Sequence, residues 1–197
     1  MPDQRGDQPA SISLNDQGWA APLLTDGLTI LDGMTLADAP AVASACRDEE
    51  TQRWLPLPNP YLLQDAIDFI NGQRGSAATN QAWIFAIRPH TRDRLIGCIG
   101  VHAQSTGVVM LGYWIAPQSR RCHHAARALR LAAGFAFDTL RARRAEMLID
   151  SQNMPSRRTA LRAGAIYEGL RRNAMRAGGK DHDSDVYALV PADLSGN

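Results

Sequence analysis

Apolar residues are spaced along this chain in two ways, and each way predicts a different kind of element. Short apolar runs bounded by turn residues predict strands, most clearly at residues 108–115. Apolar residues three or four positions apart predict helices, as at Leu129, Ala132, Ala133 and Ala136. We predict strands at residues 28–31, 81–88, 95–103, 108–115, 145–150, 166–176 and 186–190, and helices at residues 35–53, 62–73, from 125 onward and at 155–163.

Turn and capping residues separate these elements. Thr35 followed by Asp38 resembles a capping box, which opens a helix that runs towards Arg53. The Pro-rich segment 54–61 is expected to end that helix, and we predict a turn at Gly178–Gly179 between the last two strands. With 197 residues, 45% of them hydrophobic, the chain can bury one sizeable core, so we predict a single α/β domain.

Both ends of the chain are expected to lie outside this domain. Residues 1–26 are polar and lack periodicity, which predicts a flexible N-terminal extension. The domain then spans residues 27–192, and a short tail follows at 193–197. No run approaches about 18 consecutive apolar residues, and no basic segment followed by an apolar stretch opens the chain. We therefore expect a cytoplasmic protein that does not enter a membrane.

Positive charge is concentrated in one part of the chain, although the formal net charge is only +1. Residues 120–180 hold 14 Lys and Arg against 4 Asp and Glu, whereas residues 1–119 hold 7 against 12. Such a distribution concentrates phosphates and indicates a polyanionic ligand or partner. Arg outnumbers Lys 20 to 1, so a codon bias that places Arg on solvated helix faces is the alternative interpretation.

The junction between the strand at 108–115 and the following helix is the strongest candidate for an anion site. Ala116-Pro117 and a loop rich in cationic side chains connect the strand to a helix from Ala125. The first turn of a helix has free N–H groups and the positive end of the dipole, and both attract anions.

Metal binding at this junction is not expected. His123 and His124 are adjacent and would point apart on a helix, and Cys122 alone stands near them. Cys46 and Cys98 show no metal-ligand spacing, and an odd number of cysteines argues against a disulfide framework. We expect the two histidines to donate hydrogen bonds to phosphate instead.

This junction resembles the acyl-CoA-binding motif of the GNAT acetyltransferases, and within that superfamily the RimJ/RimL-type enzymes. Three more short segments resemble motifs of the family: Leu95-Ile-Gly97, Asn153-x-x-Ser156 and residues 165–169. The order of elements also matches the family from about residue 28 to 191. The resemblance implies an α+β (α/β) GNAT fold, with a mixed, mostly antiparallel central sheet flanked by helices. It also implies an N-acyltransferase in which a primary amine attacks a thioester directly, with acetyl-CoA or another acyl-CoA as co-substrate and no metal.

The resemblance also implies roles for individual residues. Ser156 would protonate the departing thiolate, although Ser156 and Asn153 beside Pro155 also fit an ordinary helix cap. The loop between the first helices would flank the acceptor amine, which gives Trp54, Tyr61 and Trp83 as acceptor-cleft residues. Donor-binding residues would be Trp114, Ile115, Ala116, Arg120, Arg121, Cys122, His123, His124, Ala125 and Asn153.

The loop departs from the family pattern at two positions. Arg121 and His123 stand where the family has small residues, usually glycine, and neither has the freedom of glycine to adopt a positive φ. Three interpretations stay open: an acyl-CoA enzyme acting on a small-molecule or N-terminal amine, an acyltransferase that takes its acyl group from aminoacyl-tRNA or an acyl carrier protein, and a non-catalytic binding protein. Among general bases, Asp150, His102 and His182 are candidates and none is preferred. Whether two copies of the chain form a homodimer also stays open.

Overall fold

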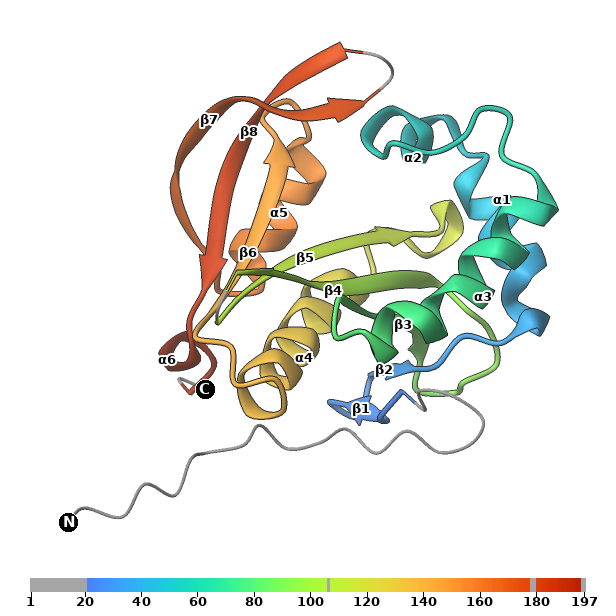
Figure 1. The fold of residues 1–197 in the computed structure, drawn as a ribbon, viewed down its shortest axis with the longest axis horizontal. Helices are drawn as coiled ribbons and strands as arrows, with labels where there is room; N and C mark the ends of the chain where they lie inside the picture. The colour runs from blue at the N-terminus through green and yellow to red at the C-terminus, as the bar shows by residue number, and fades with distance from the viewer. Residues whose placement is uncertain (1–20, 106, 178–179, 196–197) are drawn as a thin grey trace.

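The computed structural model describes residues 21–105, 107–177 and 180–195. Within them, one eight-stranded sheet has the strand order β1-β2-β3-β4-β5-β6-β8-β7 (Figure 1). Neighbouring strands are antiparallel except β5 and β6, which are parallel. The strands are β1 (Leu24–Thr25), β2 (Thr29–Asp32), β3 (Ala82–Pro89), β4 (Gly97–Ser105), β5 (Val108–Ile115), β6 (Arg144–Asp150), β7 (Ile166–Ala177) and β8 (Lys180–Leu189).

Helices cover both faces of the sheet. One hydrophobic cluster joins α4 and α5 to β3, β4, β5, β6 and β8, and a second joins α1 and α3 to the opposite face (Figure 1). The described helices are α1 (Ala39–Cys46), α2 (Glu49–Trp54), α3 (Leu63–Ala78), α4 (His124–Asp138), α5 (Met154–Arg162) and α6 (Pro191–Leu194), with 3₁₀ turns η1 (Leu36–Asp38) and η2 (Pro117–Ser119).

The prediction of a single helix from Thr35 towards Arg53 is wrong, because the structure divides this segment into η1, α1 and α2. Asp48 has an extended backbone, and its side chain accepts a hydrogen bond of 3.0 Å from the N–H of Thr51. A side chain that caps a helix in this way starts a new helix rather than continuing the old one. The capping box predicted at Thr35 and Asp38 is present and opens η1.

The ends of the domain also differ from the expectation. Most of the predicted extension, residues 1–20, lies outside the described residues. The rest of that extension, residues 21–26, contains β1, which pairs with β2. α6 reaches into the predicted tail. The last hairpin is longer than the apolar pattern indicates, because the polar first half of β8 pairs with β7. None of the helices in the described part of the chain is long and apolar enough to cross a bilayer.

α4 is held to the sheet by its apolar stripe. Leu129, Ala132 and Ala136 are fully buried, and the small alanines allow the helix to approach the strands closely. The ring of Phe135 packs edge-on against Phe85, with centroids 5.3 Å apart. This packing fixes the position of the α4 N-terminus relative to β5.

A buried ion-pair cluster attaches the α1 side to the sheet. Arg88 of β3 donates hydrogen bonds of 2.8 Å to Asp32 and of 3.0 and 2.8 Å to Asp38. Burial raises the pKa of Asp38, but the bonds from Arg88 and from the Thr35 N–H outweigh it and hold that pKa below its usual range. The pair therefore anchors η1 to β2 and β3.

We predict that Leu129→Ala lowers the free energy of unfolding by about 3 kcal/mol, because it leaves a cavity between α4 and the sheet. Leu161 of α5 is the matched control: its side chain is 55% exposed, so Leu161→Ala should cost less than about 0.5 kcal/mol. Urea unfolding of both variants measures the difference. Equal losses would contradict the assignment of the α4 stripe to the core.

Candidate active site

Strands β5 and β6 separate shortly after they meet. Their parallel pairing covers residues 108–110 of β5 and 144–146 of β6, yet β5 continues to Ile115 and β6 to Asp150. We call this separation the β5–β6 divergence. Backbone amides of β5 that point toward it have no ladder partner there, so they are available to a ligand.

Strand alternation decides which amides face the divergence. Ala116 donates its N–H to the carbonyl of Ile96, 2.9 Å away, so Ala116 and Trp114 turn their amides toward β4. The amides of Tyr113 and Ile115 therefore face the β6 side. Of the three donor-binding residues predicted here, Ile115 turns its amide toward the divergence, and Ala116 and Trp114 do not. The sequence prediction omits Tyr113.

The loop after β5 leads directly to the N-terminus of α4. The first-turn N–H groups of α4 have no intrahelical acceptor. Arg121 and His123 have φ values of 65° and 63°, in the left-handed region that favours glycine. The loop therefore has a glycine-like backbone at the two positions where the family pattern has small residues. Among the described residues, neither side chain has an ion-pair partner, and both are exposed.

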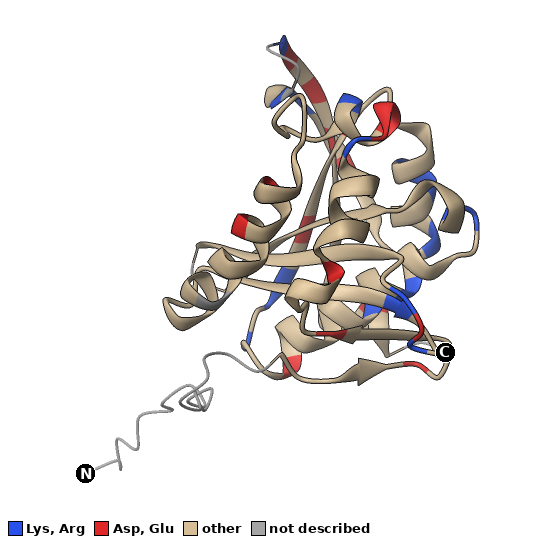
Figure 2. Ribbon diagram, turned by 90° about the vertical axis from the view of Figure 1, so that its right-hand side faces the viewer, with Lys and Arg blue, Asp and Glu red and all other residues tan. Residues whose placement is uncertain are grey.

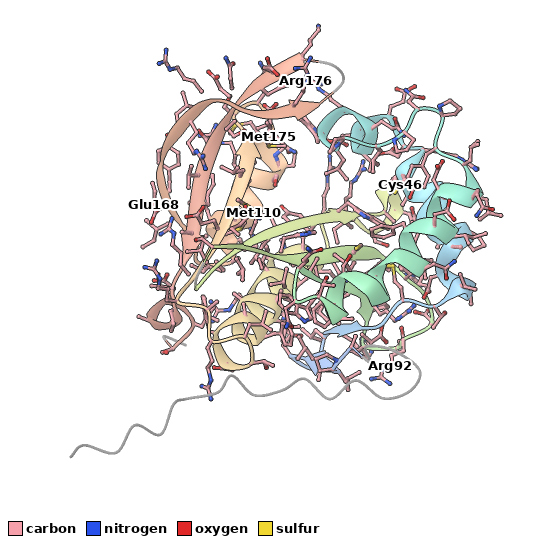
Figure 3. The ribbon with its side chains drawn as sticks, in the orientation of Figure 1. Cys46, Arg92, Met110, Glu168, Met175 and Arg176 are labelled. Atoms are coloured by element: carbon pink, nitrogen blue, oxygen red, sulfur yellow. The ribbon has the colours of Figure 1, made fainter. Side chains whose placement is uncertain are left out.

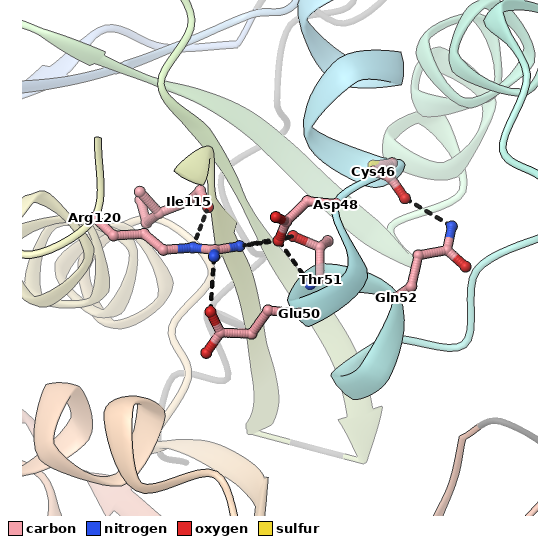
Figure 4. Close-up of polar contacts among 7 residues, drawn as sticks. All are labelled: Cys46, Asp48, Glu50, Thr51, Gln52, Ile115 and Arg120. Atoms are coloured by element: carbon pink, nitrogen blue, oxygen red, sulfur yellow. Dashed lines mark hydrogen bonds and ion pairs between the residues drawn. The ribbon is translucent and has the colours of Figure 1, made fainter. Parts of the chain in front are cut away.

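Arg120 points toward α2 (Figure 4). Its guanidinium contacts Asp48, lies 2.8 Å from Glu50 and 3.0 Å from the hydroxyl of Thr51, and Nε donates to the carbonyl of Ile115. Burial raises the pKa of Asp48, but the hydrogen bonds from Arg120 and Thr51 outweigh this effect and hold that pKa below its usual range. The positive charge of Arg120 is thus compensated within the protein, and the phosphate contact predicted for it requires these ion pairs to open.

The remaining loop residues divide between β2 and the exposed side. Nδ1 of His124 lies 2.9 Å from the hydroxyl of Thr29, so the side chain faces β2. Burial, followed by the neighbouring charge of Arg127, lowers the pKa of His124. Cys122 is exposed and Ala125 is half-buried in the first turn of α4. The lowered pKa favours the neutral imidazole, which does not oppose the helix dipole.

Ser156 meets a partner from β5 that the sequence prediction omits. Its Oγ lies 2.9 Å from the phenol oxygen of Tyr113. Burial raises the pKa of Tyr113 despite the hydrogen bonds from Ser156 and Thr159, so the phenol stays protonated. Asn153 caps α5, because its Oδ1 accepts from the N–H of Ser156 at 3.1 Å. The cap interpretation therefore describes Asn153, whereas the hydroxyl of Ser156 is directed to Tyr113.

The three predicted acceptor-cleft aromatics do not come together. Trp83 belongs to the α4 side of the core, where its ring packs against Phe135 with centroids 6.3 Å apart, so it lies in a different hydrophobic cluster from Tyr61. Tyr61 is buried between α1 and α3 and also lines a cavity of about 670 Å³ around α2. Trp54 ends α2, and the guanidinium of Arg53 lies 4.6 Å from its ring centroid.

The three candidate bases have different surroundings. Burial lowers the pKa of His102. Asp150 and His182 form a pair, since Nδ1 of His182 lies 2.7 Å from Oδ2 of Asp150. The sequence gives no hint of this pairing, because the two residues are brought together by the register of β6 and β8. In the described ranges, no group of three or more potential metal ligands is present.

Comparison with known proteins identifies the family. The sequence profile of the acetyltransferase (GNAT) domain matches residues 29–166. This chain belongs to the GNAT acetyltransferase family. The N-acetyltransferase YoaA of Bacillus subtilis (strain 168), itself uncharacterized, is 28% identical over 171 residues, which cover 86% of this chain and 97% of YoaA.

Solved structures of the family have the same fold. Mycobacterium smegmatis RimJ in complex with CoA-disulfide is 19% identical with a TM-score of 0.76, over 89% of this chain and 88% of that one. RimL, the ribosomal L7/L12 alpha-N-protein acetyltransferase in complex with coenzyme A, is 17% identical with a TM-score of 0.75, over 87% and 97%. The predicted GNAT fold, the RimJ/RimL likeness and the assignment as an N-acyltransferase are confirmed.

We predict that Arg121→Gly and His123→Gly are neutral or stabilise the protein by up to about 1 kcal/mol. Glycine removes the cost of a left-handed backbone, about 1–2 kcal/mol, and adds about 0.5–1 kcal/mol of chain entropy. Cys122→Gly is the matched control in the same loop, because Cys122 is not in the left-handed region, and it should be destabilising. Thermal unfolding of the three variants provides the comparison, and a uniform effect would refute the backbone argument.

Proposed function

We propose that this GNAT enzyme transfers an acetyl group from acetyl-CoA to a primary amine, with the α-amine of a protein N-terminus as the first acceptor class to test. The observation that carries the proposal is the β5–β6 divergence, whose free amides lie next to the α4 N-terminus and its glycine-like loop. The similar RimJ and RimL structures contain CoA, and RimL is an α-N-protein acetyltransferase.

The geometry suits two parts of the donor to two parts of the site. The free N–H groups of the α4 first turn and the uncompensated charge of Arg121 suit the phosphates of coenzyme A. The amides of Tyr113 and Ile115 suit carbonyl oxygens of the donor, and an amide beside the thioester would stabilise the tetrahedral oxyanion. The thioester would then lie in the divergence, between the two strands.

Ser156 is the proposed proton donor to the departing thiolate. Its hydroxyl can pass a proton to sulfur while the phenol of Tyr113, 2.9 Å away, supplies a hydrogen bond to the oxygen that remains. The raised pKa of Tyr113 keeps that phenol a donor at neutral pH. A non-catalytic descendant of the family would have no need of this partly buried pair, so the pair favours an active enzyme.

Arginine pairing argues against a polynucleotide as the donor. A tRNA would need several free cations on one face. Figure 2 shows acidic residues among the basic ones in the ribbon. Arg127 pairs with Asp26 and Arg157 with Asp185, and Arg130 donates to two carbonyls. These three arginines therefore hold the fold together and are not free to contact a polynucleotide.

Calorimetry with acetyl-CoA, followed by transfer assays on peptides with different N-terminal residues, tests the proposal. We expect saturable 1:1 binding of acetyl-CoA and release of CoA that depends on a peptide. Ser156→Ala should lower kcat at least tenfold and change the Kd for acetyl-CoA less than twofold, because a proton donor acts in the transition state.

Two outcomes would contradict the proposal. Wild-type protein that does not bind acetyl-CoA but binds bulk aminoacyl-tRNA with a steep salt dependence would favour the alternative donor. Acetyl-CoA binding without transfer to any peptide or small primary amine would favour a binding protein. Unchanged kcat in Ser156→Ala would leave Ser156 as part of the α5 cap only.

A further inference from the structure

Strand alternation places Asp150 and His182 on the face of the sheet opposite α4 and α5. Met147 and Ile149 of β6 pack in the α4–α5 cluster, so Asp150 lies on the other face. Tyr187 of β8 belongs to the same cluster, which puts His182 on the face of Asp150. The contact of 2.7 Å between their side chains agrees with this alternation.

The pair also lies level with the donor amides. β5 and β6 are parallel and last pair at Met110 and Glu146. Trp114 and Asp150 each stand four residues further along their strands, so they reach the same height on opposite sides of the divergence. His182 lies on β8 just beyond the Asp150–Ser184 pair; its cross-strand neighbour Met175 marks this part of the hairpin in Figure 3.

The two side chains are exposed to different degrees. Asp150 is 6% exposed, whereas the imidazole of His182 is 28% exposed. Asp150 is fixed further, because its Oδ1 accepts a hydrogen bond of 2.8 Å from the N–H of Gln152. A carboxylate held this close to Nδ1 favours the tautomer with the proton on Nδ1, which leaves the lone pair on Nε2. The buried partner thus orients a ring that solvent or a substrate can reach.

We propose that His182 is the general base for the acceptor amine and that Asp150 is its positioning residue. This inference rests on the proposed acetyl transfer. The amine approaches on the His182 face, whereas the Ser156 and Tyr113 side chains lie on the α5 face. The acid and the base are therefore on opposite faces of the divergence that would hold the thioester.

The proton balance of the step is complete. The amine nitrogen forms a bond to the carbonyl carbon, and its surplus proton moves to Nε2 of His182. The tetrahedral intermediate collapses with cleavage of the carbon–sulfur bond, and sulfur takes a proton from the Ser156 hydroxyl. The products are the amide and free CoA, and solvent exchange returns the proton from the imidazolium to the serine.

His102 is the competing base and lies in a less suitable place. It pairs with Met110 across β4 and β5, at the closed end of the divergence, four residues from the level of Trp114. No carboxylate among the described residues forms an ion pair with it. His182 combines the correct level, a fixed orientation and partial exposure.

The test compares steady-state kinetics of His182→Gln, His182→Ala and Asp150→Asn with acetyl-CoA and the best peptide acceptor of the wild-type enzyme. His90→Gln is the matched control, because His90 is exposed in the β3–β4 turn. We expect kcat to fall about 10²–10⁴-fold in both His182 variants. Asp150→Asn should lower kcat less, the Kd for acetyl-CoA should stay within twofold, and added imidazole should restore part of the activity of His182→Ala.

The outcomes separate this inference from the proposed function. A folded His182→Gln whose kcat is within threefold of wild type overturns the inference and leaves acetyl transfer intact. A fall in kcat of the same size in His102→Gln, with His182→Gln active, assigns the base to His102 instead. Wild-type protein that does not transfer acetyl groups overturns the proposed function, and the assignment of His182 falls with it.

Discussion

The parallel contact between β5 and β6 is the constraint on which the site depends. Every other neighbouring pair in the described sheet is antiparallel, and this one pair is kept short. A longer ladder would use the amides of Tyr113 and Ile115 for strand pairing. Because the strands separate after Met110 and Glu146, the sheet remains continuous while part of its backbone stays available for a ligand.

Packing on both sides maintains this arrangement. The fully buried stripe of α4 fixes the helix N-terminus beside the end of β5, and the hydrogen bond between Tyr113 and Ser156 links β5 to α5 across the separated strands. Arg120 connects the loop to Asp48 and Glu50 at the start of α2. These ion pairs join the loop after β5 to the start of α2, although α4 and the helices α1 and α3 belong to separate hydrophobic clusters.

Sequence patterns predict the parts of this protein that depend on local spacing. The strand at residues 108–115 and the buried stripe of α4 both follow from apolar periodicity. The anion site at the α4 N-terminus stays a prediction. Contacts set by register do not, which is why the sequence groups Trp83 with Trp54 and Tyr61 and omits Tyr113. Arg120 shows the same limit: its charge suggests phosphate, but long-range packing supplies Asp48 as a partner. The pairing of Asp150 with His182 likewise requires the strand order β6-β8.

Hydrogen exchange of backbone amides with and without acetyl-CoA tests the central claim most directly. If the donor occupies the β5–β6 divergence, exchange should slow at Tyr113, Ile115 and residues 121–125, while the amide of Ala116, already bonded to Ile96, should change little. Protection confined to residues 47–61 around the α2 cavity, with none at these amides, would contradict the account.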